Sequence, residues 1–329
     1  MLKCVRKIHL RVKIKNIYFD VKANIENLQN IFKNTDDKDE RLKKFNQEAL
    51  EVFQKLESES LKELESLKDN EEWENFTIAF YGETGAGKST LIECLRLFFK
   101  EQSKMNEQER FKRLYSEKND RGSGHALLGL ERLQDGATIG DGRSDNTLET
   151  KSYTFKHGDQ NFVLLDAPWI EGNEEKVMEQ ISNATQKAHA IFMLPKSPLL
   201  RKKEKKGIKD GLIDESERES LKILNKEMEK ILGGHYKGHQ IVNAQMAFYG
   251  LASALIPESG FYKNKQKFLE VFKEEELLLY KSCFKQLGGF IAETLLQNMC
   301  KKIMESNCNK ALKAVEKLQE AIKPRLMDR

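Results

Sequence analysis

The stretch GETGAGKST, residues 82–90, constrains the fold more than any other part of the chain. Gly82, Gly87, Lys88 and Ser89 satisfy the spacing G-x-x-x-x-G-K-[ST]. In such a loop, successive backbone N–H groups turn inward around an anion. Glycine permits the close approach and the positive φ angles that this geometry requires. The stretch therefore predicts a phosphate-binding loop.

The flanking residues place this loop between a strand and a helix. The β-rich apolar run FTIAFYG (76–82) precedes it, and STLIECLRLFF (89–99) follows with apolar residues at helical spacing. The helix N-terminus would then face the anion. We expect Lys88 at the β- and γ-phosphates of a nucleotide and the Ser89 hydroxyl on Mg²⁺. The candidate nucleotide-binding residues here are Gly82, Glu83, Thr84, Gly85, Ala86, Gly87, Lys88, Ser89 and Thr90.

Composition narrows the classes of protein to which the chain could belong. The chain has 329 residues and a net charge of +4, with 33% charged residues, so its surface is heavily charged but nearly balanced. Bulk charge does not favour nucleic acid, and we expect no specific nucleic acid binding. The five cysteines are scattered, without zinc-site spacing, as expected of reduced thiols in a cytosol. No apolar run approaches 18 residues and the start lacks a signal-peptide core, so we expect a cytoplasmic protein.

Helical patterns flank a central α/β region. Residues 21–71 carry an apolar stripe that predicts one long helix or two antiparallel ones, packed on the chain's own core or on a partner helix. From Lys263 to the end the chain is again predicted helical, with a hinge at Gly288-Gly289. The alternation over residues 8–14 is a basic strand pattern. The segment could be an ordinary edge strand, a disordered start, or a strand that contacts an anionic membrane. The predicted divisions are a basic segment (1–20), a helical region (21–72), a P-loop domain (73–258) and a C-terminal helical region (259–329).

The central region alternates strand and helix signals. We therefore predict an α/β fold with a P-loop GTPase-like sheet, flanked by N- and C-terminal helical segments. The strongly basic run at 196–210 is interpreted as a solvated loop. The expected elements are strands at 151–157 and 160–168 joined by a turn at Gly158-Asp159, a helix at 174–190, a buried strand at 190–195, a helix at 214–234 and a strand at 239–248.

Two further segments suit a triphosphate site. Asp166 ends the apolar strand FVLLD, so a parallel sheet would place it at the ligand-binding edge near the loop; the alternative is an Asp that caps a turn. The Gly-rich polar segment 135–153 is typical of a mobile loop and contains Thr147 and Thr150, either of which could bind Mg²⁺. We prefer Thr147. The candidate metal-binding residues are Ser89, Thr147 and Asp166.

The segments GETGAGKSTLIECLRL, IGDGRSDNTLET, LLDAPWIEG and QKAHAIFML together resemble bacterial dynamin-like GTPases of the LeoA type, over about Phe76 to Phe268. The resemblance implies binding of GTP or GDP with Mg²⁺. The segment VNAQMAF (242–248) also resembles the base-contacting loop of that family, with Asn243 and Ala244 at the positions that contact the base. It also implies self-association as a homodimer or with a second dynamin-like chain, and peripheral contact with an anionic membrane.

The chain departs from that family at three places. Trp169 stands where the D-x-P-G motif has its Gly, although Gly172 could compensate. Thr84-Gly85 replace the Gln-Ser of eukaryotic dynamins, so no catalytic residue is assigned. The N-K-x-D motif is absent: Asn225-Lys226-Glu227-Met228 lacks the Asp and is either a helix face or a degenerate base reader.

Four functions therefore stay open at this point. The first is a dynamin-like GTPase that hydrolyses GTP with Mg²⁺. The second is a nucleotide-binding switch or scaffold with little hydrolysis, and the third is a P-loop ATP-binding protein. The fourth is a structural coiled-coil protein in which the glycine-rich loop is accidental.

Overall fold

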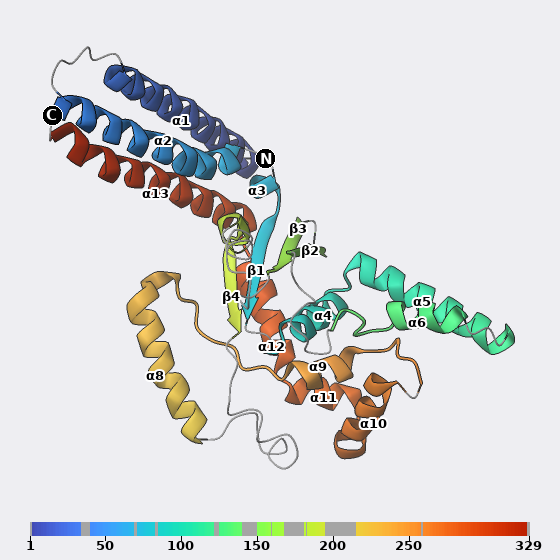
Figure 1. Ribbon diagram of the computed structural model, residues 1–329. Coiled ribbons are helices and arrows are strands. Elements are labelled where there is room, and N and C mark those ends of the chain that lie inside the picture. The colour runs from blue at the N-terminus through green and yellow to red at the C-terminus, as the bar shows by residue number, and fades with distance from the viewer. Residues whose placement is uncertain are drawn as a thin grey trace. The chain divides into compact units, whose positions relative to one another are not determined.

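The computed structural model describes residues 2–33, 40–68, 71–82, 85–121, 125–139, 150–158, 160–167, 181, 183–194, 215–257 and 259–327 (Figure 1). The chain divides into two compact units. The first comprises Met1–Thr77, Thr185–His189 and Asn298–Arg329, and the second comprises Ile78–Ala184 and Ala190–Gln297. Both units therefore combine segments that lie far apart in the sequence.

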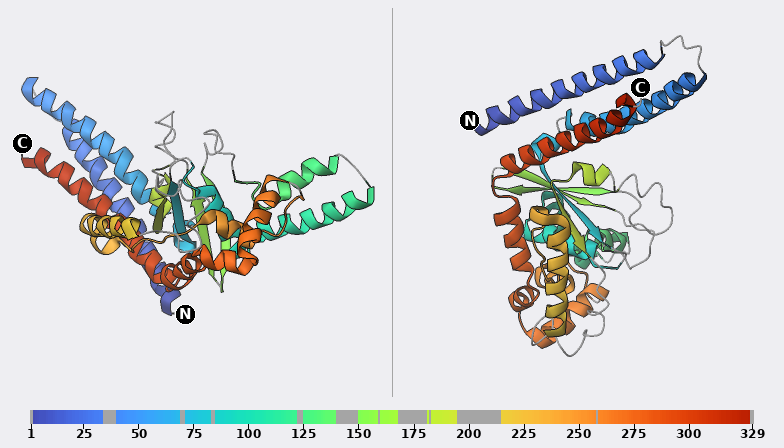
Figure 2. Two further views of the ribbon diagram at one scale, coloured as in Figure 1. Left: turned by 90° about the horizontal axis from the view of Figure 1, so that it is seen from below. Right: turned by 90° about the vertical axis from the view of Figure 1, so that its left-hand side faces the viewer.

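Three long helices lie side by side in the first unit, as the views of Figures 1 and 2 agree: α1 (Leu2–Lys33), α2 (Glu40–Lys68) and α13 (Met299–Met327). The short α3 (Glu71–Glu74) follows α2. The rings of Phe32 on α1 and Phe53 on α2 lie 5.3 Å apart, and Ile322 of α13 packs on the same cluster. The stripe predicted over residues 21–71 thus packs on the chain's own core, and it forms two antiparallel helices.

The predicted strand over residues 8–14 is wrong, because this segment lies within α1. The buried residues of α1 include Ile14, Tyr18, Ile25 and Phe32, which recur at intervals of four and seven and so share one helical face. Val12, which the alternating pattern grouped with Ile14, is instead 51% exposed. The alternation was too short to distinguish a strand from one side of a long helix.

A mixed four-stranded sheet lies at the centre of the α/β part. Its order is β2-β3-β1-β4. β1 (Phe76–Gly82) and β4 (Ala190–Leu194) are parallel, and β2 (Lys151–His157) and β3 (Gln160–Asp166) are antiparallel. The chain leaves β1, returns beside it as β3, and then crosses to its other side as β4. This reversal is the kind of switch point at which open α/β sheets bind ligands.

The predicted strand, loop and helix around the glycine-rich stretch are confirmed. β1 is buried along its whole length, and α4 (Lys88–Phe98) begins six residues after it ends. α4 is followed by Phe99, whose ring lies 5.5 Å from that of Phe162 on β3. The β2–β3 hairpin turn is also as predicted, with Gly158 at φ +60°.

The second unit contains further helices besides α4. α5 and α6 lie side by side as a hairpin in both Figures 1 and 2. None of the described helices of the whole chain combines the length and apolarity that a membrane span requires. The elements are α5 (Gln102–Arg121), α6 (His125–Leu133), α8 (Glu215–Leu232), the 3₁₀ helix η3 (Gly233–His235), α9 (Ala244–Leu251), α10 (Gly260–Phe272), α11 (Glu275–Lys281), α12 (Phe284–Gly289) and the π-helix η4 (Phe290–Leu295).

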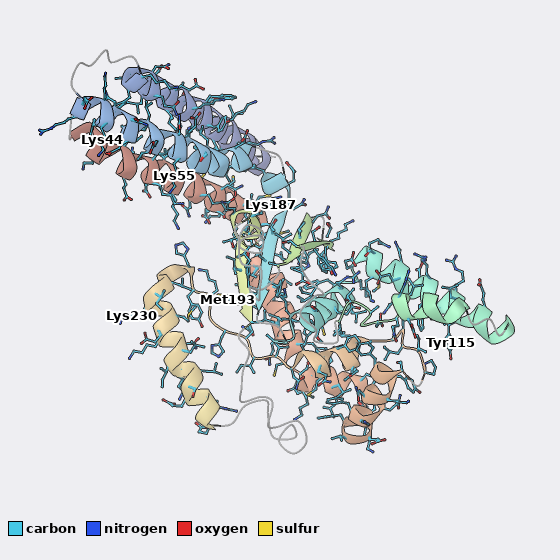
Figure 3. The ribbon with its side chains drawn as sticks, viewed as in Figure 1. Lys44, Lys55, Tyr115, Lys187, Met193 and Lys230 are labelled. Atoms are coloured by element: carbon cyan, nitrogen blue, oxygen red, sulfur yellow. The ribbon has the colours of Figure 1, made fainter. Side chains whose placement is uncertain are left out.

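Two strand predictions need correction. The segment 239–248 is not a strand, because Asn243 caps α9: its side chain accepts a hydrogen bond from Met246 N–H. β4 was expected to be buried, yet Met193 is 68% exposed, and its side chain is labelled in Figure 3. Within the described residues β4 is the last strand of the sheet, so one of its edges has no neighbour. Of the helix predicted at 174–190, residues 181 and 183–187 are helical, whereas residues 188–190 are not. Residues 174–180 and 182 lie outside the described residues.

The predicted hinge at Gly288-Gly289 is also wrong, because the chain passes through both residues in helical geometry into η4. Gly288 is instead a packing position: a Cβ there would lie 2.6 Å from the ring of Phe98. Gly289 has open space around its Cβ position.

These adjacent glycines give a matched pair of substitutions. Gly288→Ala should destabilise the chain by about 1–3 kcal/mol, because the Phe98 ring must move to admit the methyl group. Gly289→Ala should be neutral or stabilising by up to about 1 kcal/mol, because alanine favours the helix. Urea unfolding of both variants tests this difference, and equal effects would show that Gly288 has no special packing role.

Candidate functional site

The glycine-rich loop has the backbone geometry that the sequence predicts. Gly85 and Gly87 have φ angles of +77° and +86°, and a Cβ at either position would meet nothing within 4 Å. Their requirement for glycine is therefore conformational. Gly87 is the N-cap of α4, and no side chain caps the first N–H groups of that helix. The loop thus presents backbone donors and open space at one end of α4.

Gly82 has a different role from the other loop glycines. It pairs with Leu194 in the β1–β4 register, and a Cβ on Gly82 would lie 2.9 Å from Leu194 Cβ. The motif's first glycine is therefore required for the close approach of two strands. Glu83 and Thr84 lie outside the described residues. Ala86, Ser89 and Thr90 are all half-buried around the start of α4.

Lys88, the first residue of α4, and Asp166, at the carboxyl end of β3, form a buried ion pair. Lys88 Nζ lies 2.9 Å from Asp166 Oδ1, and the two side chains are 8% and 4% exposed. Lys88 Nζ also donates to the backbone carbonyl of Ala167. Asp166 is therefore not a turn cap alone: it faces the lysine of the loop, as expected if both act at one ligand.

Oxygen atoms suited to a divalent cation lie at the same edge of the sheet. Asp166 Oδ1 is buried and has no hydrogen-bond donor in good geometry, so its described partner is the Lys88 charge. The Thr150 hydroxyl is likewise buried without a hydrogen bond. Thr150 directly precedes Lys151, which pairs with Asp166 across β2 and β3. Among the two predicted threonines, Thr150 thus has an available oxygen, while Thr147 lies outside the described residues.

The carboxylate of Asp166 and the hydroxyl groups near it suit Mg²⁺ bound together with a phosphate better than a metal ion bound by protein side chains alone. Mg²⁺ typically takes one or two carboxylates, substrate phosphates and water. In the described part of the chain no three His, Cys, Asp or Glu side chains cluster to hold a metal ion. Asp166 with the Ser89 hydroxyl would suffice only if a phosphate supplied further oxygens.

The predicted base-contacting residues lie beside the phosphate-loop helix. Asn243 and Ala244 begin α9, which packs on α4, and the Cys94 thiol contacts the Ala244 carbonyl at 3.4 Å. Cys94 lies six residues beyond Lys88, or about 9 Å along the helix axis. Asn243 Oδ1 is used by the helix cap, which leaves its amide NH₂ group for a ligand.

The Asn225-Lys226 pair, considered above as a degenerate form of the missing base-reading motif, lies on a helix. Asn225 is within α8, and its Oδ1 accepts from the Tyr236 hydroxyl and lies 2.7 Å from His239 Nδ1. Its side chain therefore fixes the segment that follows α8. Trp169 and Gly172 of the predicted γ-phosphate segment lie outside the described residues, and so does the basic run at 196–210.

The sequence patterns did not predict a buried cluster of charged side chains around α4, the helix that follows the phosphate loop. Lys104 of α5 lies 2.7 Å from Glu93 of α4 and 3.3 Å from Asp135, and all three side chains are fully buried. Arg96 bridges Glu93 and Glu101 at 3.1 Å each. The available signal was an (i, i+3) pair of opposite charges inside an apolar helix.

The same cluster joins α4 to two other segments. Glu93 accepts hydrogen bonds from Gly136 N–H and the Thr138 hydroxyl, each at 3.0 Å. Asp135 accepts from the N–H groups of Ser253 and Ala254 at 2.8 Å each, just after α9. The helix that starts at the phosphate loop and the helix that starts at Asn243 are therefore held by one network.

The charges within this cluster stabilise each other. Burial alone would raise the pKa of Glu93, but Lys104, the Gly136 N–H and Arg96 outweigh burial and the pKa is lowered. Burial alone would lower the pKa of Lys104, but Glu93 and Asp135 outweigh it and the pKa is raised. Both groups are thus charged at neutral pH.

Comparisons with known proteins add no relative. No family model, no curated protein and no solved structure matches this chain. The resemblance to bacterial dynamin-like GTPases therefore rests on the sequence motifs alone and stays a prediction. The α/β fold with a mixed sheet is confirmed, whereas membership of the P-loop GTPase fold belongs to the proposal that follows.

Proposed function

We propose that this chain is a P-loop nucleotide-binding protein of the GTPase type, which binds a nucleoside triphosphate with Mg²⁺. The observation that carries the proposal is the buried pair of Lys88 and Asp166, 2.9 Å apart, beside the left-handed Gly85 and Gly87. The glycine-rich loop also follows β1, the strand that has β3 on one side and β4 on the other. Open α/β sheets bind ligands at such a switch in strand order.

Each residue has a distinct task in this proposal. Backbone N–H groups of Gly85 to Ser89 surround the phosphates, and the α4 N-terminus adds its favourable dipole. Lys88 contacts the β- and γ-phosphates as a point charge. Ser89 and Asp166 would hold Mg²⁺, with Thr147 or Thr150 as a further ligand. The cation would neutralise charge that develops on the phosphates.

Guanine is the base we propose, on the strength of the dynamin-like resemblance. Its support within the fold is the position of Asn243 and Ala244 at the N-terminus of α9, directly against α4. Because no described residue supplies the carboxylate of an N-K-x-D motif, base selection would depend on this loop. ATP binding is the alternative, and competition between GTP, GDP and ATP for the site distinguishes the two.

Hydrolysis is the second part of the proposal, with a binding switch that turns over little as its alternative. The alternative is favoured by Trp169 at the position of the motif's glycine. Phosphate release measured at saturating Mg²⁺-GTP tests this point directly. Sustained release that is lost in the Lys88→Ala variant supports a GTPase, whereas tight binding with no release supports the switch. Self-association and contact with anionic membrane remain predictions of the resemblance.

A further inference from the structure

The β2–β3 hairpin contacts α4 and the residue after it at three levels along the helix. At one end, the ring of Phe99 packs on the aromatic rings of the hairpin. At the other end, Lys88 pairs with Asp166 at 2.9 Å. Between these two levels, the guanidinium carbon of Arg96 on α4 lies 4.7 Å from the centre of the Tyr153 ring on β2. The contact between Arg96 and Tyr153 is therefore the middle one of the three.

Arg96 offers the Tyr153 ring a fixed surface. Its side chain is buried, and its N–H groups donate to the carboxylates of Glu93, Glu101 and Glu107 at 3.1–3.4 Å. Such bonds lie near the plane of the guanidinium group and leave its face for an aromatic ring. The Tyr153 ring is thus packed against a cation that three carboxylates hold in place.

Tyr153 lies close in the chain to residues of the candidate site. It comes two residues after Lys151, which pairs with Asp166 across the hairpin. It comes three residues after Thr150, whose hydroxyl is buried. A strand advances about 3.3 Å per residue and is extended, so the position of the ring along α4 determines where Thr150 and Asp166 lie relative to Lys88.

Tyr153 adds no charge of its own to this region. Burial raises the pKa of its phenol to about 12, so the group is neutral at physiological pH. The positive charge of Arg96 opposes the shift and the negative charge of Asp166 adds to it, so the phenol lies within electrostatic reach of both. An effect of Tyr153 on Asp166 would then be one of position and not of charge.

We propose that Tyr153 is a positioning residue for the candidate site. Its ring, stacked on Arg96, fixes the β2–β3 hairpin along α4. Asp166 is thereby held opposite Lys88, with the Thr150 hydroxyl at the same edge of the sheet. Loss of the ring leaves the aromatic contacts at the far end of the hairpin and lets the Asp166 end shift. This inference rests on the proposed function, and it adds a residue outside the set that would bind the nucleotide and the metal.

The test compares substitutions of Tyr153 in the full chain. Tyr153→Leu removes the ring, whereas Tyr153→Phe keeps it and removes only the hydroxyl. The measurement is the Mg²⁺ concentration that gives half-maximal binding of a non-hydrolysable GTP analogue. Tyr153→Leu should need at least about tenfold more Mg²⁺ than the wild-type chain, and Tyr153→Phe should stay within about threefold of it. Tyr153→Ile carries the test if the leucine variant does not fold, because a branched side chain suits a strand.

Two controls separate position from stability. Tyr115→Leu makes the same substitution at a ring of α5 that stacks on Phe111 in another hydrophobic cluster, and it should leave the Mg²⁺ requirement unchanged. Hydrogen exchange measured without nucleotide reports on the hairpin directly. It should become faster over residues 151–166 in Tyr153→Leu and not in Tyr153→Phe.

The outcomes separate this inference from the function on which it rests. A raised Mg²⁺ requirement in Tyr153→Leu, with Tyr153→Phe and Tyr115→Leu like the wild-type chain, supports the inference. Faster exchange of the hairpin with an unchanged Mg²⁺ requirement overturns the inference alone, because Tyr153 then only stabilises the fold. An equal rise in Tyr153→Phe also overturns it, because the ring is then not the cause. Absence of binding by the wild-type chain even with Mg²⁺ overturns the proposed function and the inference with it.

Discussion

Replacement of Lys88 by alanine should weaken binding of Mg²⁺-GTP by about 100-fold, because hydrogen bonds to charged groups contribute about 1.5–3 kcal/mol each. The variant removes the only described cation at the loop and leaves backbone N–H groups to hold the phosphates. Fluorescence titration with a labelled GTP analogue measures the change. Retained affinity would show that the glycine-rich loop does not bind the phosphates.

A matched lysine controls for the loss of one positive charge. Lys112 is exposed on α5 and Lys112→Ala should leave the affinity unchanged. Because Lys88→Ala also leaves Asp166 without its partner, thermal unfolding of each variant shows whether the fold persists. A loss of affinity in a folded variant then reports on the site and not on stability.

Replacement of Lys104 by methionine should lower the free energy of unfolding by about 3–5 kcal/mol, the usual result of removing one partner from a buried ion pair. Methionine preserves most of the aliphatic stem, so the change isolates the charge. Glu93 and Asp135 would then face each other's charge with less compensation. Urea unfolding followed by circular dichroism measures the difference.

An exposed pair gives the control for this prediction. Lys222 and Glu219 on α8 also lie at ion-pair distance, but they are 69% and 65% exposed. Lys222→Met should therefore change stability by less than about 1 kcal/mol. Similar losses in the two variants would contradict the assignment of the buried cluster as a main support of the fold.

The contribution of the buried cluster should also depend on pH. The lowered pKa of Glu93 means that its share is complete above the ordinary value of 4.5 and is lost as the pH falls through the lowered pKa. The raised pKa of Lys104 means that its share is complete below 10.5 and is lost as the pH rises through the raised pKa. The stability difference between the wild-type chain and Lys104→Met should be largest between these limits.

Local patterns predicted the parts of the fold that local chemistry decides. The strand at Phe76–Gly82, the glycine-rich turn and the helix from Lys88 follow from residues within one short stretch. The β2–β3 hairpin follows from two alternating runs around Gly158. The proximity of Lys88 and Asp166 also followed from the sequence, because strand ends in a parallel arrangement meet at one edge.

The errors arose where distant residues decide the outcome. Residues 8–14 belong to a long helix, α1, that packs on α2 and on α13 from the other end of the chain, and Ile14 is buried there. Gly288 is a packing glycine because Phe98, 190 residues earlier, contacts the position of its missing Cβ. The ionic cluster joins Glu93, Lys104 and Asp135 across three segments, which no single-segment pattern can reveal.

The most direct test of the central claim is calorimetric titration of the purified chain with a non-hydrolysable GTP analogue, GDP and an ATP analogue, with and without Mg²⁺. We expect saturable one-site binding of the guanine nucleotides with Mg²⁺, and rejection of the ATP analogue. Equal binding of ATP and GTP would retain the phosphate site and overturn the choice of guanine. Absence of binding by every nucleotide with Mg²⁺ present would contradict the account as a whole.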